Sequence, residues 1–328
     1  MKWATPMNNI IPMNNKYIKS TLVLLFTFIA FSLFSAEPPF AKKKRSYKVP
    51  SYSSNIILDR ICDLEMQVDF RLNGKVKSHI LEYTTRGRKG TEKILGLSTR
   101  YFPAFEYYND HYNLPNELRS LMIIESGLNP MVSSPTGARG LWQLMPATAR
   151  SYGLQINDYV DERCDPYKST EAALKHLSFL FEQFDDWTLA IAAYNCGGVR
   201  VRAAIKKGKS KNFWKIKKHL PKETQDYVQK FIAVNYLVNY YMFYDLRPQY
   251  PDYTYQLTEP ILIFSYNKLS RIGVKHGIDL GILYKLNPSY VKGIIPPNEE
   301  GNIVLLPVLG KKEIKETAAL LPNSKNRM

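Results

Sequence analysis

Cysteine and histidine are scarce in this chain, and their positions exclude several kinds of site. Among 328 residues there are three cysteines, Cys62, Cys164 and Cys196, and five scattered histidines. The cysteine spacing matches no metal-binding pattern, and an odd number leaves at least one thiol outside any disulfide framework. We therefore interpret the cysteines as small apolar residues and expect neither a metal nor another cofactor.

Long hydrophobic runs are also few, and the main one is too short to cross a membrane. Residues 22–34 form an apolar run that follows Lys16 and Lys19, and they fall short of the ~20 residues that a spanning helix needs. A run of this length behind positive charge is typical of a signal-peptide core. We expect residues 1–36 to be a signal peptide or, if uncleaved, an N-terminal anchor associated with the membrane. Either reading predicts export to the periplasm or cell envelope.

Acidic residues are outnumbered, and one segment lacks them altogether. The chain has 45 basic and 29 acidic residues, a formal net charge of +16. Residues 200–222 contain ten lysines and arginines and no acid, with Phe213 and Trp214 among them. Such a run is compatible with nucleic acid, an acidic glycan or an anionic lipid. A solvated basic face is the favoured reading, and expected export argues against nucleic acid as a partner.

The chain divides by composition into consecutive segments, without an internal repeat. Residues 37–56 are rich in lysine, proline and serine and predict a flexible linker. From about residue 101 the hydrophobic spacing becomes that of helices, whereas strand-like runs flank two short helices after residue 253. The predicted domains are 37–100, a basic linker and N-terminal extension; 101–250, a mainly α domain; 251–310, a small β-α-α-β unit; and 311–328, a tail.

Several residues predict where helices begin. Asp165 and Asp186 each precede a stretch with helical hydrophobic spacing and can accept from free N–H groups of the first turn. Thr224 can cap a long helix in the same way. Gly197 and Gly198 interrupt the chain after the second of these helices.

Glu125 is the first candidate for chemistry. Leu118, Leu121, Met122 and Glu125 are spaced to share one helical face, on which only the last is not apolar. Burial there disfavours the charged carboxylate, and the negative end of the helix dipole acts in the same direction, so the pKa is expected to rise. A carboxyl still protonated near neutral pH can serve as a general acid. The alternative is a boundary glutamate whose head group reaches water.

Four motifs around Glu125 carry a resemblance to a known family. They are Glu125-Ser-Gly-Leu-Asn-Pro130, Ser134 to Pro146, Ala192 to Gly197 with Tyr194-Asn195, and Leu220 to Val228 with Glu223 and Tyr227. Together, and in this order, they resemble the catalytic domain of lytic transglycosylases that cleave bacterial peptidoglycan, most closely the membrane-bound lytic murein transglycosylase D branch. The resemblance covers about residues 101–245. It implies an α+β, lysozyme-like fold that is mostly helical. Cys196 stands where the family usually has alanine.

The resemblance also implies a role for each motif residue. Glu125 matches the sole catalytic acid and base. The residues that match positions lining the sugar cleft or supporting the glutamate are Ser134, Gln143, Met145, Tyr194, Asn195, Glu223 and Tyr227. Trp142 and Met145 could equally be core residues, and the acids between Asp158 and Asp165 are better interpreted as helix caps than as a second catalytic carboxylate.

The implied reaction needs one carboxyl. The family counterpart of Glu125 protonates the bond between N-acetylmuramic acid and N-acetylglucosamine, then acts as base on the muramic acid's 6-hydroxyl, which closes a 1,6-anhydro ring. Peptidoglycan strands are then the partner, and protein partners are undefined. Two alternatives stay open: a hydrolytic muramidase in which water attacks, and a non-catalytic peptidoglycan-binding protein.

The C-terminal segment resembles a degenerate LysM module, a family that binds glycans containing N-acetylglucosamine. The likeness rests on Leu283-x-x-Leu286-Asn287-Pro288 and the closing segment Gly301 to Pro307, and the usual Gly-Asp-Thr opening is missing. A small structural appendage is an equal alternative.

Overall fold

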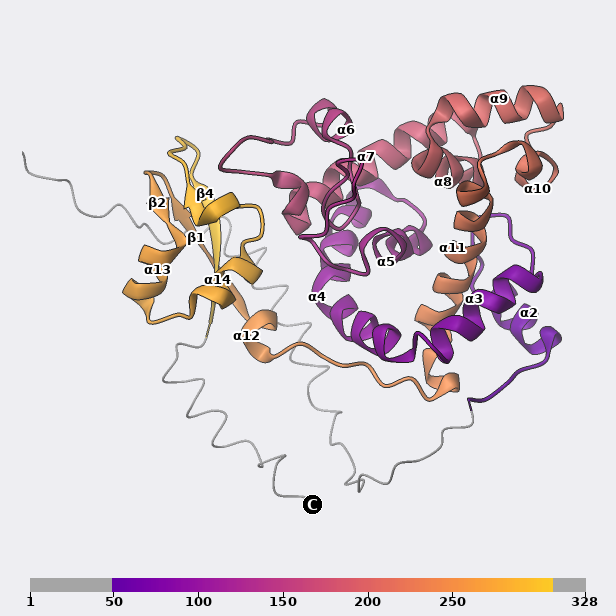
Figure 1. Ribbon diagram of the computed structural model, residues 1–328, viewed down its shortest axis with the longest axis horizontal. Coiled ribbons are helices and arrows are strands. Elements are labelled where there is room, and N and C mark those ends of the chain that lie inside the picture. Colours follow the sequence, from indigo (N-terminus) through magenta and orange to yellow (C-terminus); the bar gives the residue numbers. More distant parts are fainter. Residues whose placement is uncertain (1–48, 309–328) are drawn as a thin grey trace, which may run out of the picture. The chain divides into compact units, whose positions relative to one another are not determined.

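The computed structural model describes residues 49–308 (Figure 1). Within this range the chain forms two compact units, residues 49–251 and residues 252–308. The expected signal or anchor at 1–36 and the tail at 311–328 lie outside the described residues. No helix in the part of the chain that the structure describes has the length and apolar character needed to span a bilayer.

The larger unit consists of helices and connecting loops, which the sequence predicts from about residue 101. Its α-helices and 3-10 helices are, in chain order, α2 (Ser54–Cys62), α3 (Gly74–Thr84), α4 (Arg88–Tyr112), η2 (Asn116–Arg119), α5 (Ser120–Ser126), α6 (Pro146–Ser151), η3 (Glu162–Cys164), α7 (Pro166–Phe184), α8 (Trp187–Cys196), α9 (Gly198–Gly208), α10 (Phe213–Ile216), η4 (Lys217–His219), α11 (Lys222–Tyr240) and η5 (Tyr241–Tyr244).

Helix α11 is the central element of this unit. It packs against α3, α5 and α8, which come from three distant parts of the sequence (Figure 1). Its inward side chains include Val228, Phe231, Ile232 and Tyr236, all fully buried. Burial of such side chains is the main stabilising contribution to a helical core. The same helix therefore holds the core together and carries the motif that begins at Glu223.

The N-terminal extension belongs to this unit. Helix α4 passes through residue 101, where the change to helical hydrophobic spacing predicted a domain boundary, so no boundary lies there. A Cβ atom on Gly96 would lie 1.8 Å from the backbone oxygen of Gln249, so α4 directly contacts the chain that follows α11. Arg88, at the start of α4, is half-buried and donates to the backbone oxygens of Tyr244 and Asp245.

The predicted helix starts are confirmed for two residues and wrong for a third. Asp165 accepts from the Lys168 N–H at 3.0 Å, and Asp186 accepts from the Leu189 N–H at 2.8 Å. Helix α11 instead begins at Lys222, and Thr224 lies inside its first turn with its hydroxyl engaged elsewhere. The cysteines are free thiols; Cys164 and Cys196 are buried, whereas Cys62 is exposed.

The C-terminal unit has the predicted β-α-α-β order with two further short strands. Strands β1 (Thr258–Ile263) and β4 (Asn302–Pro307) pair antiparallel, with Ile261 opposite Val304. Helix α12 (Tyr253–Gln256) precedes β1. The elements between β1 and β4 are, in chain order, β2 (Asn267–Lys268), α13 (Leu269–His276), α14 (Leu280–Leu286), η6 (Val291–Gly293) and β3 (Ile294–Ile295). Asn287 ties α14 to β4, since its amide accepts from the Leu305 N–H at 2.7 Å and donates to the Leu305 oxygen at 2.9 Å.

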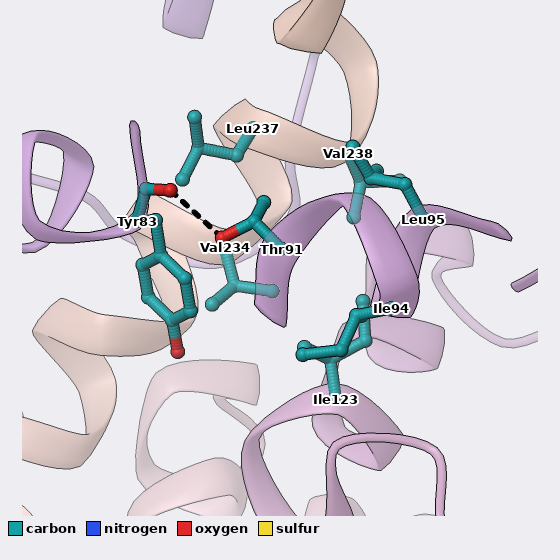
Figure 2. Close-up of a pocket in the computed structure, with 8 residues that line it drawn as sticks. All are labelled: Tyr83, Thr91, Ile94, Leu95, Ile123, Val234, Leu237 and Val238. Atoms are coloured by element: carbon teal, nitrogen blue, oxygen red, sulfur yellow. Dashed lines mark hydrogen bonds between the residues drawn. The ribbon is translucent and has the colours of Figure 1, made fainter. Parts of the chain in front are cut away.

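A small apolar cavity of about 20 Å³ lies inside the larger unit (Figure 2). Its lining comes from α3, α4, α5 and α11 and consists of Tyr83, Thr91, Ile94, Leu95, Ile123, Val234, Leu237 and Val238. The Thr91 hydroxyl is turned to the backbone oxygens of Tyr83, at 2.8 Å, and Gly87, at 3.1 Å. The space could admit one water molecule, but the lining offers it few polar partners, so we expect it to be dry.

Candidate active site

Helix α5, which carries Glu125, is short and ends at Ser126. Leu118, on η2, and Leu121 and Met122, on α5, are fully buried, whereas Glu125 on the same face is partly accessible. The predicted shared face is therefore present. Gly127 follows with φ of 58°, in the left-handed region that ends helices, and its N–H donates to the Ile123 oxygen at 2.9 Å.

The position of this helix end is fixed by a serine. The Ser126 hydroxyl lies 2.9 Å from both the Met122 oxygen within α5 and the Leu141 oxygen in the following loop. It donates to one of them at a time, and both contacts hold the loop against the helix. Glu125 is thereby held beside residues 128–145, which contain the second motif.

The Glu125 carboxyl is surrounded by groups with opposing effects on its pKa. Burial raises the pKa from its ordinary 4.5 to about 7. The hydrogen bond that the Tyr227 hydroxyl donates to Oε1 and the charge of Lys230 lower it, while the charge of Glu223 raises it. At neutral pH a large fraction of the carboxyl is therefore protonated, and a single group can both release and accept a proton.

A second tyrosine stands near the carboxyl. The Tyr194 hydroxyl, from α8, donates to the backbone oxygen of Trp142 at 2.7 Å. Burial and the nearby charge of Glu125 raise its pKa well above 10, so it stays neutral. Trp142 itself is fully buried, donates from Nε1 to Thr170 Oγ1 at 2.9 Å and stacks on Phe105, so it is a core residue and not a sugar platform.

The loop of the second motif is folded by its own polar side chains. Ser134 Oγ accepts from the Ala138 N–H at 2.9 Å, and the Ser134 N–H donates to the Ala138 oxygen. Gln143 has φ of 46°, and its Nε2 donates to the oxygens of Val132 and Gly140 at 3.1 and 3.0 Å. Both residues therefore shape the loop, while Gln143 Oε1 has no hydrogen-bond partner within residues 49–308.

The loop at residues 128–145 packs against Arg163 through a glycine, and the ion pair of Arg163 supports it. A Cβ atom on Gly140, where φ is 88°, would lie 1.7 Å from the Arg163 backbone oxygen. The buried Arg163 guanidinium pairs with Asp161 Oδ2 at 2.8 Å and donates to the oxygens of Gly137 and Leu144. Asp161 thus supports the loop through Arg163, and it also accepts from the Arg163 N–H at the start of η3. Asp165 accepts from N–H groups at the start of α7 in the same way, which agrees with the interpretation of both residues as helix caps.

Asn195 and the fourth motif are linked directly. Asn195 Oδ1, at the end of α8, accepts from Thr224 Oγ1 at 2.7 Å. Glu223 is exposed one turn before Tyr227 on α11, and Met145 is 43% exposed at the start of α6. The structure therefore gathers Glu125, Tyr227, Tyr194 and Glu223 within electrostatic reach of one another, whereas Ser134, Gln143 and Asn195 are seen here making hydrogen bonds that fix the backbone or an adjacent helix.

Sequence reasoning missed Lys230 and the hydrogen bond between Thr224 and Asn195. Lys230 follows Tyr227 by three positions on α11, so helical spacing from an assigned tyrosine was a signal that could have found it. No local pattern pointed from Thr224 to Asn195, because 29 positions separate the two residues.

Comparison with known proteins gives this geometry a family context. Residues 103–217 match the family described as the transglycosylase SLT domain. The chain is 34% identical over 212 residues to membrane-bound lytic murein transglycosylase D of Escherichia coli K12, covering 63% of this chain and 46% of that protein. It is 46% identical over 100 residues to a putative tributyltin chloride resistance protein of an Alteromonas species, covering 30% of this chain and 48% of that protein.

A solved structure is also similar. The 70 kDa soluble lytic transglycosylase of Escherichia coli aligns with 27% identity and a TM-score of 0.39, over 43% of this chain and 24% of that one. The chain spans about half the length of the curated relatives that it matches.

Proposed function

Because residues 103–217 match the transglycosylase SLT domain family, we propose that this chain is a peptidoglycan lytic transglycosylase acting in the cell envelope. The observation that carries the proposal is the Glu125 carboxyl, whose pKa is raised to about 7 by burial and whose Oε1 is oriented by Tyr227. Its relatives' names describe lytic murein transglycosylases.

In the first step the protonated Glu125 donates to the oxygen that bridges N-acetylmuramic acid and N-acetylglucosamine. The bond from C1 to that oxygen breaks, and positive charge develops at C1. Oε1 is occupied by Tyr227, so the proton is expected to leave from Oε2. Tyr194 and Tyr227 remain neutral, since burial raises the pKa of both hydroxyls well above 10.

In the second step the Glu125 carboxylate takes the proton of the muramic acid's own 6-hydroxyl. The hydroxyl oxygen attacks C1 and closes a 1,6-anhydro ring. The proton returned to Glu125 is equivalent to the one donated, so the enzyme is restored and no water is consumed. A pKa close to ambient pH suits a group that performs both transfers.

Ser134, Gln143, Met145, Asn195 and Glu223 are proposed to line or support the sugar cleft. Gln143 Oε1 is the amide acceptor suited to a sugar hydroxyl or N-acetyl N–H. Asn195 and Glu223 come from α8 and α11, which the Thr224 hydrogen bond joins.

One observation keeps the hydrolytic muramidase as a second candidate. Glu223 lies near enough for its charge to raise the Glu125 pKa, and it is exposed. Two carboxylates beside one bond are the usual arrangement for hydrolysis, in which the second can activate water.

Mass spectrometry of digested sacculi tests the proposal. Muropeptides ending in 1,6-anhydro-N-acetylmuramic acid are expected from the wild-type chain, whereas reducing ends would favour the muramidase. Glu125→Gln should lower the rate by roughly 10²–10⁴ because proton transfer is lost. Undiminished lysis by that variant would exclude the role given to Glu125, and binding without any lysis by the wild type would identify a non-catalytic peptidoglycan-binding protein. Glu223→Gln is the matched control, expected to keep anhydro products.

A further inference from the structure

The region between α8 and α11 carries a dense group of unpaired positive charges. We name residues 198–222, comprising α9, α10 and η4, the basic hairpin. Its ten cationic residues are Arg200, Arg202, Lys206, Lys207, Lys209, Lys211, Lys215, Lys217, Lys218 and Lys222. None of them forms a salt bridge with any residue in the described range 49–308. All except Lys217 are exposed.

The basic hairpin is a packed element. Val201, Ala204, Phe213 and Ile216 are buried and turn one side of it to the core. A Cβ atom on Gly208 would lie 2.8 Å from Ile216 Cγ2, so the end of α9 lies directly against α10. Both helices are therefore anchored to the core by apolar side chains, and nine of the ten charged side chains remain exposed.

Two pKa shifts in the basic hairpin come mainly from burial, and like charges of the hairpin itself add to the one at His219. Burial lowers the pKa of Lys217, and nearby Lys75 lowers it further against the opposing effect of Asp226. Burial also lowers the pKa of His219, and the charges of Lys207 and Lys218 add to this. Such a surface creates a positive potential that attracts anions over about a Debye length, ~8 Å at physiological salt.

Both ends of the basic hairpin adjoin site residues. It begins directly after Tyr194 and Asn195 on α8 and leads into Glu223 and Tyr227 on α11 (Figure 1). Arg200 Nη1 donates to the oxygen of Cys196 at 2.8 Å and so connects the first turn of α9 to the end of α8. An anionic polymer held in the site could therefore continue onto this surface.

The side chains narrow the choice of partner. Val199 is the only large apolar side chain of the basic hairpin that is strongly exposed, which leaves little to insert into a membrane. Trp214 is half-buried, with Arg71 over its ring at 5.5 Å and Lys217 at 5.7 Å, so its face is not free to stack on a nucleic-acid base. Among these partners, a flexible polymer that carries separate anionic groups suits the exposed charges of the basic hairpin better than a membrane or a nucleic acid does.

We propose that the basic hairpin is a docking surface for the free carboxylates of the peptides attached to the glycan strand, outside the residues that hold the sugars. This inference rests on the proposed function, because it takes peptidoglycan as the substrate. The surface would favour strands that still carry acidic peptides over bare glycan. Each exposed ion pair contributes little, so affinity should come from several contacts and weaken with salt.

Co-sedimentation with sacculi tests this surface. The full chain carrying Glu125→Gln is used, so binding is measured without cleavage. The first set of substitutions removes three charges from the basic hairpin: Lys206→Gln, Lys207→Gln and Lys211→Gln. The control set removes three exposed charges before and within α4: Arg86→Gln, Lys89→Gln and Lys93→Gln. At low salt the first set should weaken binding roughly five-fold or more and the control set much less. The difference should vanish at about 0.5 M salt.

Further arms decide the source of the negative charge. Sacculi whose peptide carboxylates have been converted to amides should bind both triple variants equally. A persisting difference on amidated sacculi, or equal weakening by the control set, would overturn the proposal. The proposal would also be overturned if the first set weakened binding to vesicles of phosphatidylglycerol and phosphatidylethanolamine, or to duplex DNA, but did not weaken binding to sacculi. The products that the wild-type chain releases from sacculi are analysed separately. Products with reducing ends would contradict the proposed function and leave the binding result for the basic hairpin valid.

Discussion

At the scale of single residues, Glu125, the group proposed as the catalytic acid, also affects the stability of the fold through its raised pKa. Its pKa of about 7 in the folded chain lies above its ordinary 4.5, so folding favours the protonated form. The folded chain then binds more protons than the unfolded chain between these values, and its stability falls as pH rises through that window. Below about pH 4.5 the raised pKa costs no stability, and above about pH 7 the loss of stability has reached its full size.

Glu125→Gln should therefore be more stable than wild type at pH 8 and nearly equal to it at pH 4. Glutamine has no charge to bury and can still accept from Tyr227. The expected difference at pH 8 is about 1–3 kcal/mol in the free energy of unfolding. Urea denaturation at several pH values measures it, and a gap that does not change between pH 4 and pH 8 would contradict the raised pKa.

Tyr227→Phe tests the hydrogen bond to Glu125. This bond lowers the Glu125 pKa, so its removal should raise the pKa further and move the alkaline decline of kcat/KM to higher pH, by up to about one unit. The orientation of Oε1 is also lost, so kcat should fall roughly ten-fold. The pH profile of sacculus digestion provides the measurement. A lower kcat with an unshifted profile would mean that the hydroxyl acts only through packing.

At the scale of elements, the loop at 128–145 depends on close backbone approach. Gly140→Ala would place Cβ against the Arg163 oxygen, and both Gly140 and Gly137 have positive φ, at 88° and 90°. No atom lies within 4 Å of a Cβ built on Gly137, which makes Gly137→Ala the matched control for backbone strain alone. We expect Gly140→Ala to lower the melting temperature and the lytic rate much more than Gly137→Ala, with a stability cost of several kcal/mol against about 1–2 kcal/mol. Equal effects would show that the contact with Arg163 is not limiting.

The helix starts at Asp165 and Asp186 could be predicted because a cap joins residues two or three positions apart. The face containing Leu118 and Glu125 was predictable for the same reason, and so was the upward direction of the Glu125 pKa. Contacts across the fold could not be read in this way. Thr224 resembled a cap but binds Asn195 on another helix, and the burial of Trp142 depends on Thr170, 28 positions later.

At the scale of the whole molecule, the two compact units have separate cores, so they should respond separately to mutation. Leu283 is fully buried in the C-terminal unit. Leu283→Ala should destabilise that unit by about 2–5 kcal/mol and leave the unfolding of residues 49–251 unchanged. Calorimetry should then show one transition lowered and another constant, whereas a single transition that shifts as a whole would mean that the units unfold together.

Leu283→Ala also bears on the glycan-binding role implied by the LysM likeness, which stays a prediction. Sacculus binding that falls when only this unit melts would support it. Binding that persists would leave the unit as a structural appendage, and the basic hairpin would then be the remaining surface outside the sugar site for which binding is proposed.

The apolar cavity behind α5, which we expect to be dry, should make the larger unit sensitive to hydrostatic pressure. Unfolding eliminates internal voids and so reduces volume, and compression therefore favours the unfolded state. Ile123, in the wall of this void, belongs to the same short helix as Glu125 (Figure 2). Val234→Ile would add one methylene group to the wall opposite, on α11, and should therefore reduce the volume lost on unfolding beside the acid-bearing helix.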